Sequence, residues 1–247
     1  MAERENGISL LNRNMLKLIA FVSMVIDHAS YCFLRPPIRA LVRGSAGRIA
    51  FPLFCWLFFL GFFRVRSYGK HLLLLAGSAV MAEFFYDYVF YGVQTYKYIG
   101  DQNVMCSWLL GFLMLMVLSK LESLPAADLV LAVTMDVGII FTFAVLCTVC
   151  HTDYEFIVPL ALGACYLLRK YLFHQDDSIV NQKTYGLVIA CVTAVCSSPG
   201  ALLALPFIVL YSDVPCRNKY KYLYYFGYPG HLALLSAILF LKGVFHS

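Results

Sequence analysis

The first long apolar segment of the chain contains two ionisable residues whose spacing suits chemistry. Lys17 and His28 are eleven positions apart. In an α-helix, eleven steps of 100° complete three turns plus about 20°, so the two side chains share one face roughly 16 Å apart. A neutral imidazole can accept a proton from an attacking nucleophile. The pair therefore predicts one groove, with a cation at its rim and a candidate general base deeper inside.

Asp27 stands beside His28 and has two interpretations. Neighbouring residues of a helix point about 100° apart, so Asp27 is expected to meet Ser23, one turn earlier, or a partner on another helix rather than orient the imidazole. Ionisable groups inside membrane spans are costly and mark functional sites by default. Asp27 and His28 are therefore either catalytic or a buried polar contact that locks helices together, and both interpretations stay open.

Other polar residues interrupt or border apolar segments farther along. Arg48 precedes the second segment, where it pairs with a buried acid or a phosphate, or simply extends to the interface. Glu83 and Asp87 lie one turn apart and either share a proton for acid–base chemistry or form a hydrogen-bonded core. Asn103 is an N-cap candidate. His231 opens the last segment, where a lone histidine is usually structural.

Membrane helices must hold these residues. The chain has 247 residues, is 61% hydrophobic and 13% charged, and has a mean hydropathy of +0.75. A soluble domain is about 45–50% apolar and about 25% charged. Apolar stretches near the roughly 20 residues that cross a bilayer recur along the chain. We expect one all-α domain over residues 1–247, a polytopic transmembrane bundle of about nine spans. The expected spans are 16–34, 49–63, 71–92, 103–119, 129–149, 155–173, 184–198, 200–212 and 228–246.

Two features of this map are open. The region 184–212 is either two short spans or one broken element, because its halves are separated only by Ser198-Pro199-Gly200. The loop before the second span carries Arg35, Arg39 and Arg43 on one helical face. These arginines either lie beside anionic headgroups or form an anion-binding rim over a cavity.

The distribution of basic residues predicts the orientation. With the N-terminus inside, the cytoplasmic segments hold 13 of the 19 Lys and Arg residues and the outer segments hold 6. The positive-inside rule favours this arrangement. We therefore expect a multi-pass protein of the cell membrane, in contact with membrane lipids, with a cytoplasmic N-terminus and a C-terminus outside.

Composition also excludes several kinds of site. Most of the nine cysteines lie inside apolar segments, where they behave as small hydrophobes. We therefore expect neither a disulfide framework nor a metal site. The net charge of +5 is ordinary for a membrane protein and implies no nucleic-acid partner. The polar N-terminus is not followed by a signal-peptide cleavage site, so the first span is expected to remain.

Taken together, five sequence motifs resemble those of the TraX family. They occur in the same order as in the family and cover nearly the whole chain. The most specific motif is the one that runs from Gly47 to Phe54. In many relatives the Asp-Tyr motif is followed by glycine, where this chain has Glu155. The first span also resembles the wider acyltransferase-3 class, which has a basic residue, usually arginine, ten intervening positions and a histidine. The motifs are Lys17 with Asp27-His28, Gly47-Arg48-Ile49-Ala50-Phe51-Pro52-Leu53-Phe54, Asn103-Val104, Asp153-Tyr154, and Tyr228-Pro229-Gly230-His231-Leu232.

This resemblance implies an acetyltransferase, since the founding activity of the family is acetylation of a pilin subunit's N-terminus. Here it implies transfer of an acetyl group from acetyl-CoA to an amine or hydroxyl acceptor: a peptide N-terminus, a glycan or a small molecule. No metal is implied. The implied catalytic residues are His28, Asp27 and Arg48, the donor-binding residues are Lys17, Arg64 and Arg66, and the acceptor-binding residues are Asn103, Asp153, Tyr154 and His231.

Two other functions stay open. Asp27, Glu83, Asp87 and Asp136 are candidate proton or cation carriers of a small-solute transporter. The third possibility is a non-catalytic assembly or scaffold protein. Binding of CoA or acetyl-CoA to the folded chain raises its apparent stability, whereas a transporter or a scaffold has no reason to respond.

Overall fold

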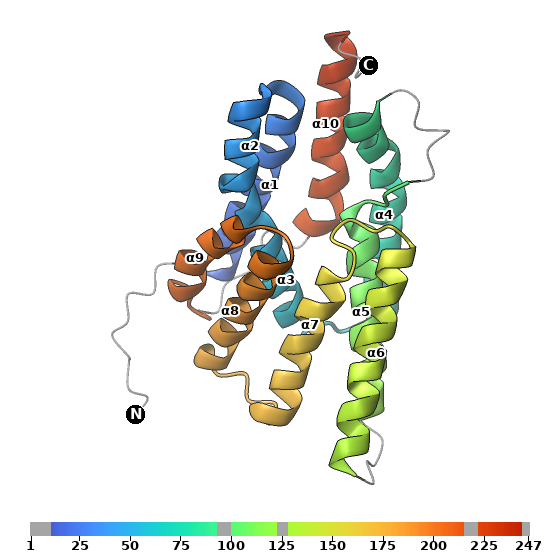
Figure 1. The fold of residues 1–247 in the computed structure, drawn as a ribbon, viewed down its shortest axis with the longest axis vertical. Helices are drawn as coiled ribbons and strands as arrows, with labels where there is room; N and C mark the ends of the chain where they lie inside the picture. The colour runs from blue at the N-terminus through green and yellow to red at the C-terminus, as the bar shows by residue number, and fades with distance from the viewer. Residues whose placement is uncertain (1–10, 93–99, 123–127, 215–221, 244–247) are drawn as a thin grey trace.

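A computed structural model describes residues 11–92, 100–122, 128–214 and 222–243. Within these ranges the chain forms helices joined by loops, with isolated β-bridges that pair Leu11 with Tyr211 and Gln102 with Thr152. The described chain is therefore an all-α bundle, and this part of the prediction is confirmed (Figure 1).

The first part of the bundle alternates long helices with short turns. Asn12 caps the first helix, since its side-chain oxygen accepts from the backbone N–H of Met15 at 3.0 Å. Pro36 occupies the first turn of the second helix, where a missing N–H does little harm. A 3₁₀ turn, Ala46–Ile49, joins the second helix to the third. The helices are α1 (Arg13–Phe33), α2 (Pro36–Gly44), α3 (Ala50–Phe62), α4 (Tyr68–Tyr91) and α5 (Val104–Glu122).

The second part contains shorter helices extended by tighter or wider turns. A π-helical turn, Leu168–Leu172, follows α7, and another, Leu223–Gly227, precedes α10. The 3₁₀ helix Pro199–Ala204 leads into α9. The helices are α6 (Leu129–Val149), α7 (Ile157–Leu167), α8 (Ile179–Cys196), α9 (Leu205–Val209) and α10 (Tyr228–Leu241).

These helices follow the expected spans closely. Among the described residues, six helical segments are long and apolar enough to cross a membrane. Three shorter elements take the places of the other expected spans: α7 with its π-helical turn, Pro199–Val209 and Tyr225–Leu241. The six segments are Arg13–Phe33, Pro36–Phe62, Tyr68–Tyr91, Val104–Glu122, Leu129–Val149 and Ile179–Cys196.

The second span begins earlier than predicted. The sequence predicts a loop before residue 49, whereas α2 and α3 together form the 27-residue apolar segment Pro36–Phe62. Arg43 lies beside Asp27, and Arg39 lies beside Tyr31, so α2 runs antiparallel along the end of α1. The arginines lower the mean hydropathy of this nine-residue helix, so the sequence does not predict it as part of a membrane span. Here these two are held by partners on α1.

The region 184–212 forms two antiparallel elements. After α8 the chain turns at Gly200, where a Cβ atom would lie 3.0 Å from the carbonyl carbon of Gly44. It then returns beside α8 to the other end of the helix, where Asp213 accepts from the side-chain amide of Gln182 at 3.1 Å. The returning element, Pro199–Val209, is shorter than a full crossing.

The third helix, α3, lies in the middle of the bundle and α6 at its edge (Figure 1). Trp56 of α3 is fully buried, and its indole N–H donates to the carbonyl of Gln182 on α8 at 2.7 Å. By contrast, α6 presents large apolar side chains outward, with Phe141 68% exposed. Because apolar faces of this kind are unfavourable in water, they are the lipid-facing surface of a multi-pass membrane protein.

Candidate active site

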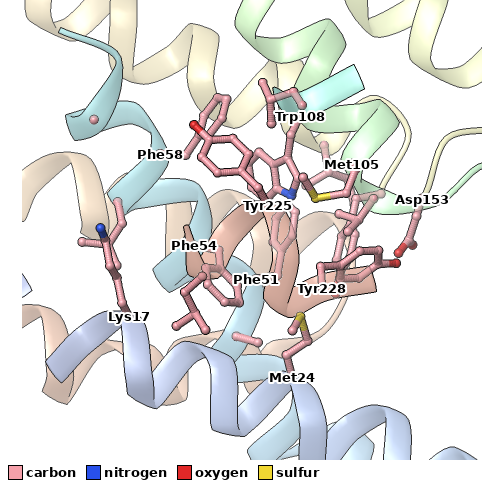
Figure 2. A pocket seen from close by; sticks show the side chains of 18 of the residues that line it. Lys17, Met24, Phe51, Phe54, Phe58, Met105, Trp108, Asp153, Tyr225 and Tyr228 are labelled. Atoms are coloured by element: carbon pink, nitrogen blue, oxygen red, sulfur yellow. The ribbon is translucent and has the colours of Figure 1, made fainter. Parts of the chain in front are cut away.

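A cavity of about 1240 Å³ lies between α1, α3, α4, α5 and the start of α10. Small-molecule pockets are typically about 300–1,000 Å³, so this one has room for a long ligand and a second molecule. Lys17 and His28 both line it, as their helical spacing predicts. Figure 2 shows Lys17 and Asp153 at opposite sides of the cavity, with Phe51 and Tyr228 between them.

One end of the cavity is basic. Asp213 accepts from Arg13 Nη2 at 3.0 Å and from Arg64 Nη2 at 3.1 Å, so one carboxylate is shared by two guanidinium groups. The remaining cations leave this end positive, and a cleft lined by one sign of charge concentrates ligands of the opposite sign. The cations that line it are Arg13, Lys17, Arg64, Arg66 and Lys70.

Aromatic side chains line the middle of the cavity. The ring of Trp108 lies 5.0 Å from that of Phe58 and 5.6 Å from that of Phe51, measured between centroids. These rings make an apolar wall between the basic end and the polar end (Figure 2). The aromatic lining includes Phe51, Phe54, Phe58, Trp108, Tyr225 and Tyr228.

The far end of the cavity collects acidic and basic side chains from four segments. Arg43 Nε donates to Asp27 Oδ1 at 3.3 Å, so Asp27 has its partner on another helix. Ser23, the other partner considered for Asp27, instead donates to the carbonyl of Ala46 at 2.5 Å. The Nε of Arg48 is buried and has no hydrogen-bond partner among the described residues. The polar lining here is Asp27, His28, Arg43, Arg48, Asp153 and Tyr154.

His28 makes its closest polar contact with His231. The two atoms His28 Nδ1 and His231 Nε2 are 2.6 Å apart, and the rings stack with centroids 4.9 Å apart. The other ring nitrogen of His231 lies 3.0 Å from the carbonyl oxygen of Gly227. As helical geometry predicts, Asp27 does not orient the imidazole.

The loop between α6 and α7 closes this end. Tyr154 stacks on Phe51, with centroids 3.8 Å apart and ring planes 8° apart. The backbone N–H of Asp153 donates to the carbonyl of Gln102 at 2.7 Å. Burial raises the pKa of the Asp153 carboxyl to about 6, although the neighbouring Arg48 acts to lower it.

Comparison with known proteins places the chain in a family. The TraX protein family model matches residues 12–239 of the chain. The chain belongs to the TraX family. It is similar to the probable fimbrial assembly protein FimC, serogroup H1, of Dichelobacter nodosus, with 26% identity over 244 residues that cover 92% of this chain and 96% of that protein. No solved structure matches the chain.

Of the ten predicted site residues, eight line the cavity, whereas Asn103 and His231 lie behind its wall. Asn103 is fully buried and its amide donates to Glu83 and, at 2.9 Å, to the carbonyl of Ala79. Its side-chain oxygen accepts from the backbone N–H of Met105 at 2.9 Å. Asn103 thus caps α5 and joins it to α4. His231, the second, supports His28 from behind.

The Asp-Tyr motif has a strained backbone in this TraX chain. Tyr154 has φ +63° and Glu155 has φ +32°, a region that favours glycine. This chain therefore adopts a left-handed turn at Tyr154 and Glu155 without a glycine at either position.

The four acids of the transporter interpretation do not line one cavity together. Asp27 lines the cavity, whereas Glu83, Asp87 and Asp136 do not. Glu83 holds Asn103, and Asp136 accepts from Lys170 Nζ at 2.7 Å at the contact between α6 and α7. Among the described residues, these carboxylates therefore lie in more than one site.

Several cavity residues carried little or no signal in the sequence. Arg43 was detectable through its four-residue spacing from Arg39, but it is the only one of the three loop arginines that lines this cavity, so the rim interpretation holds for Arg43 alone. His71 was not, because it stands alone at the start of a span. Its Nδ1 lies 2.5 Å from the hydroxyl of Tyr225, which comes from a segment 154 residues away.

Proposed function

We propose that this TraX-family protein is a membrane-embedded acetyltransferase that transfers an acetyl group from acetyl-CoA to an amine or hydroxyl acceptor. The observation that carries this proposal is one cavity with a basic end, an aromatic middle and a His28 end. A CoA thioester has the matching order of groups, with phosphates at one end and a reactive carbonyl at the other.

The basic end fits the donor's phosphates. Guanidinium and ammonium groups are the usual phosphate ligands of proteins. Asp213 is shared between Arg13 and Arg64, so the positive charge there exceeds the negative. Lys17, Arg64 and Arg66 would hold the phosphates. The aromatic wall would contact the thinner arm that carries the thioester.

The orientation predicted from the basic residues agrees with this assignment. The basic end lies at the start of α1, so a cytoplasmic N-terminus opens it toward the cytoplasm, where acetyl-CoA is available. Arg43 and Arg48, which the charge count placed outside, line the cavity. Arg13, Lys17, Arg64, Arg66 and Lys70, which were counted as cytoplasmic, line it too. Without these seven residues the bias toward the cytoplasmic side keeps its direction, 8 to 4. The basic residues of 215–221 and the chain end 244–247 lie outside the described residues.

The chemistry follows from His28. A lone pair on its ring accepts the proton of the acceptor's N–H or O–H as the acceptor attacks the thioester carbonyl. A carbon–nitrogen or carbon–oxygen bond forms, the carbon–sulfur bond breaks, and the proton passes from His28 to the departing sulfur. Arg48 would stabilise the negative charge that develops on the carbonyl oxygen. Asp27 would hold Arg43 and balance the charge around the site.

The acceptor proposed first is a peptide N-terminus. The FimC relative is named a fimbrial assembly protein, which makes the N-terminal amine of a fimbrial subunit the first acceptor to test. Asp153 and Tyr154, at the far end of the cavity, would contact this acceptor.

Transfer from labelled acetyl-CoA in membranes containing the protein tests the proposal. A short peptide with a free N-terminus should be labelled, and the same peptide with a blocked N-terminus should not. His28→Ala should lower transfer by on the order of 10²–10⁴-fold while CoA binding persists. The exposed His174 provides a control as His174→Asn, because asparagine tolerates its φ of +46°. A folded His28→Ala protein with wild-type transfer would refute the mechanism.

A further inference from the structure

One contact of His231 determines where its proton lies. Nδ1 of His231 is 3.0 Å from the carbonyl oxygen of Gly227. A carbonyl oxygen can only accept a hydrogen bond, so Nδ1 must carry the proton. In the neutral ring, Nε2 of His231 is then unprotonated and presents a lone pair. The backbone of the turn before α10 thus selects the tautomer of His231.

The tautomer of His28 follows from that of His231. Nδ1 of His28 lies 2.6 Å from the lone pair on Nε2 of His231. Two lone pairs at this distance would repel, so Nδ1 of His28 carries the proton that joins them. Nε2 of neutral His28 is then the basic nitrogen. It has no hydrogen-bond partner among the described residues, and His28 lines the cavity.

We propose that His231 is a positioning residue that fixes the tautomer of His28 and stabilises its protonated form. The proposal rests on the acetyltransferase function above, in which Nε2 of His28 accepts the acceptor's proton. When it does, the Nδ1–H of His28 becomes a charged donor to His231, and such hydrogen bonds are roughly twice as strong as neutral ones. His231 thereby holds the role that a carboxylate has beside the histidine of a hydrolase triad.

Packing supports a positioning role. His231 is 7% exposed and does not line the cavity, so it lies behind His28 rather than beside a substrate. The ring of His28 is also held edge-to-face by Phe90, with centroids 5.3 Å apart. The adjacent carboxylate, Asp27, is bonded to Arg43. His231, expected from the sequence to contact the acceptor, is therefore assigned to His28.

Paired substitutions at residue 231 test this role. His231→Gln keeps an acceptor atom near the position of Nε2, whereas His231→Phe keeps the ring and loses the acceptor. His231→Phe should lower kcat by at least about 10-fold, a part of what a general base contributes, with little change in the affinity for acetyl-CoA. His231→Gln should recover most of the loss. In a His28→Ala background His231→Phe should lower transfer no further, because residues that act as a unit are not additive.

Two kinetic results would overturn the proposal. One is a His231→Phe protein with wild-type kcat. The other is a His231→Phe change that lowers transfer equally with and without His28, since that is the behaviour of a residue that only supports packing.

A spectrum tests the pair without turnover. In protein labelled with ¹⁵N-histidine, the His28 signals are assigned by their loss in His28→Gln. Near neutral pH the wild type should show a protonated Nδ1 and an unprotonated Nε2, and His231→Phe should lose this preference. A wild type with the proton on Nε2 would overturn the proposal. No acetyl transfer from a wild type with the expected spectrum would refute the acetyltransferase function and uphold the tautomer assignment.

Discussion

Gly47 lies against the carboxylate of Asp27. A Cβ atom at residue 47 would be 2.8 Å from Asp27 Cγ and nearer still to its Oδ1. This approach lets the turn Ala46–Ile49 pack directly on α1, where Ser23 donates to the carbonyl of Ala46. It also brings Arg48 and Asp27 to the same end of the cavity. Glycine is therefore required here for close packing.

Gly47→Ala should destabilise the protein by about 1–3 kcal/mol, because the added methyl group overpacks the contact with Asp27. Thermal unfolding of the purified protein measures the change. Gly77→Ala is the matched control, since a Cβ atom there meets nothing within 4 Å and alanine favours a helix by up to about 1 kcal/mol. Equal unfolding temperatures for the two variants would contradict the packing argument.

Arg43 should matter more than Arg39, although both guanidinium groups stack on Tyr31, at 5.2 and 5.4 Å from the ring centroid. Only Arg43 bonds Asp27. Arg43→Gln should therefore lower stability by roughly 1–3 kcal/mol more than Arg39→Gln, because it leaves a largely buried charge without this partner. Combining each change with Asp27→Asn should remove the difference. If the difference persists in the double variants, the ion pair is not its cause.

Glu155→Gly should leave stability unchanged or raise it by up to about 1 kcal/mol, because glycine relieves the left-handed strain at this position. Thr152→Gly in the same loop should lower stability, since it removes a buried hydroxyl that bonds the carbonyl of Cys147. Chemical unfolding of both variants measures this. An equal loss from both would show that the side chain of Glu155 contributes more than the strain costs.

The stability of the protein should depend on the protonation of Asp153. Burial raises the pKa of this carboxyl to about 6, so the folded state binds the proton more tightly than the unfolded state. The stability that protonation contributes is complete below about pH 4 and is lost as the pH rises through 6. Asp153→Asn should therefore gain stability relative to the wild type between pH 4.5 and about 7, as measured by unfolding. A constant difference between wild type and Asp153→Asn would contradict this.

The fold was readable from the sequence because bilayer crossing imposes a local signal. The span 129–149 matches α6, since its apolar run is long and uninterrupted. The loop expected before residue 49 was wrong because α2 carries arginines whose charges are balanced by contacts with α1. Hydropathy records composition and does not record those contacts.

The site was only partly readable for a related reason. Lys17 and His28 belong to one helix, so helical periodicity alone predicted that they share a face, and that face lines the cavity. The contact of His28 with His231 joins residues 203 positions apart, and no local pattern encodes such a pairing. Likewise Asn103 looked like a site residue until its partner Glu83 on α4 was known.

Binding of acetyl-CoA to the purified protein tests the central claim most directly. Acetyl-CoA should raise the unfolding temperature, and acetylpantetheine, which lacks the phosphates, should do so much less. Lys17→Ala should weaken binding by at least about 10-fold at low salt and by less at high salt, whereas Lys120→Ala, outside the cavity, should not. Equal stabilisation by both compounds, or none by acetyl-CoA, would contradict the account.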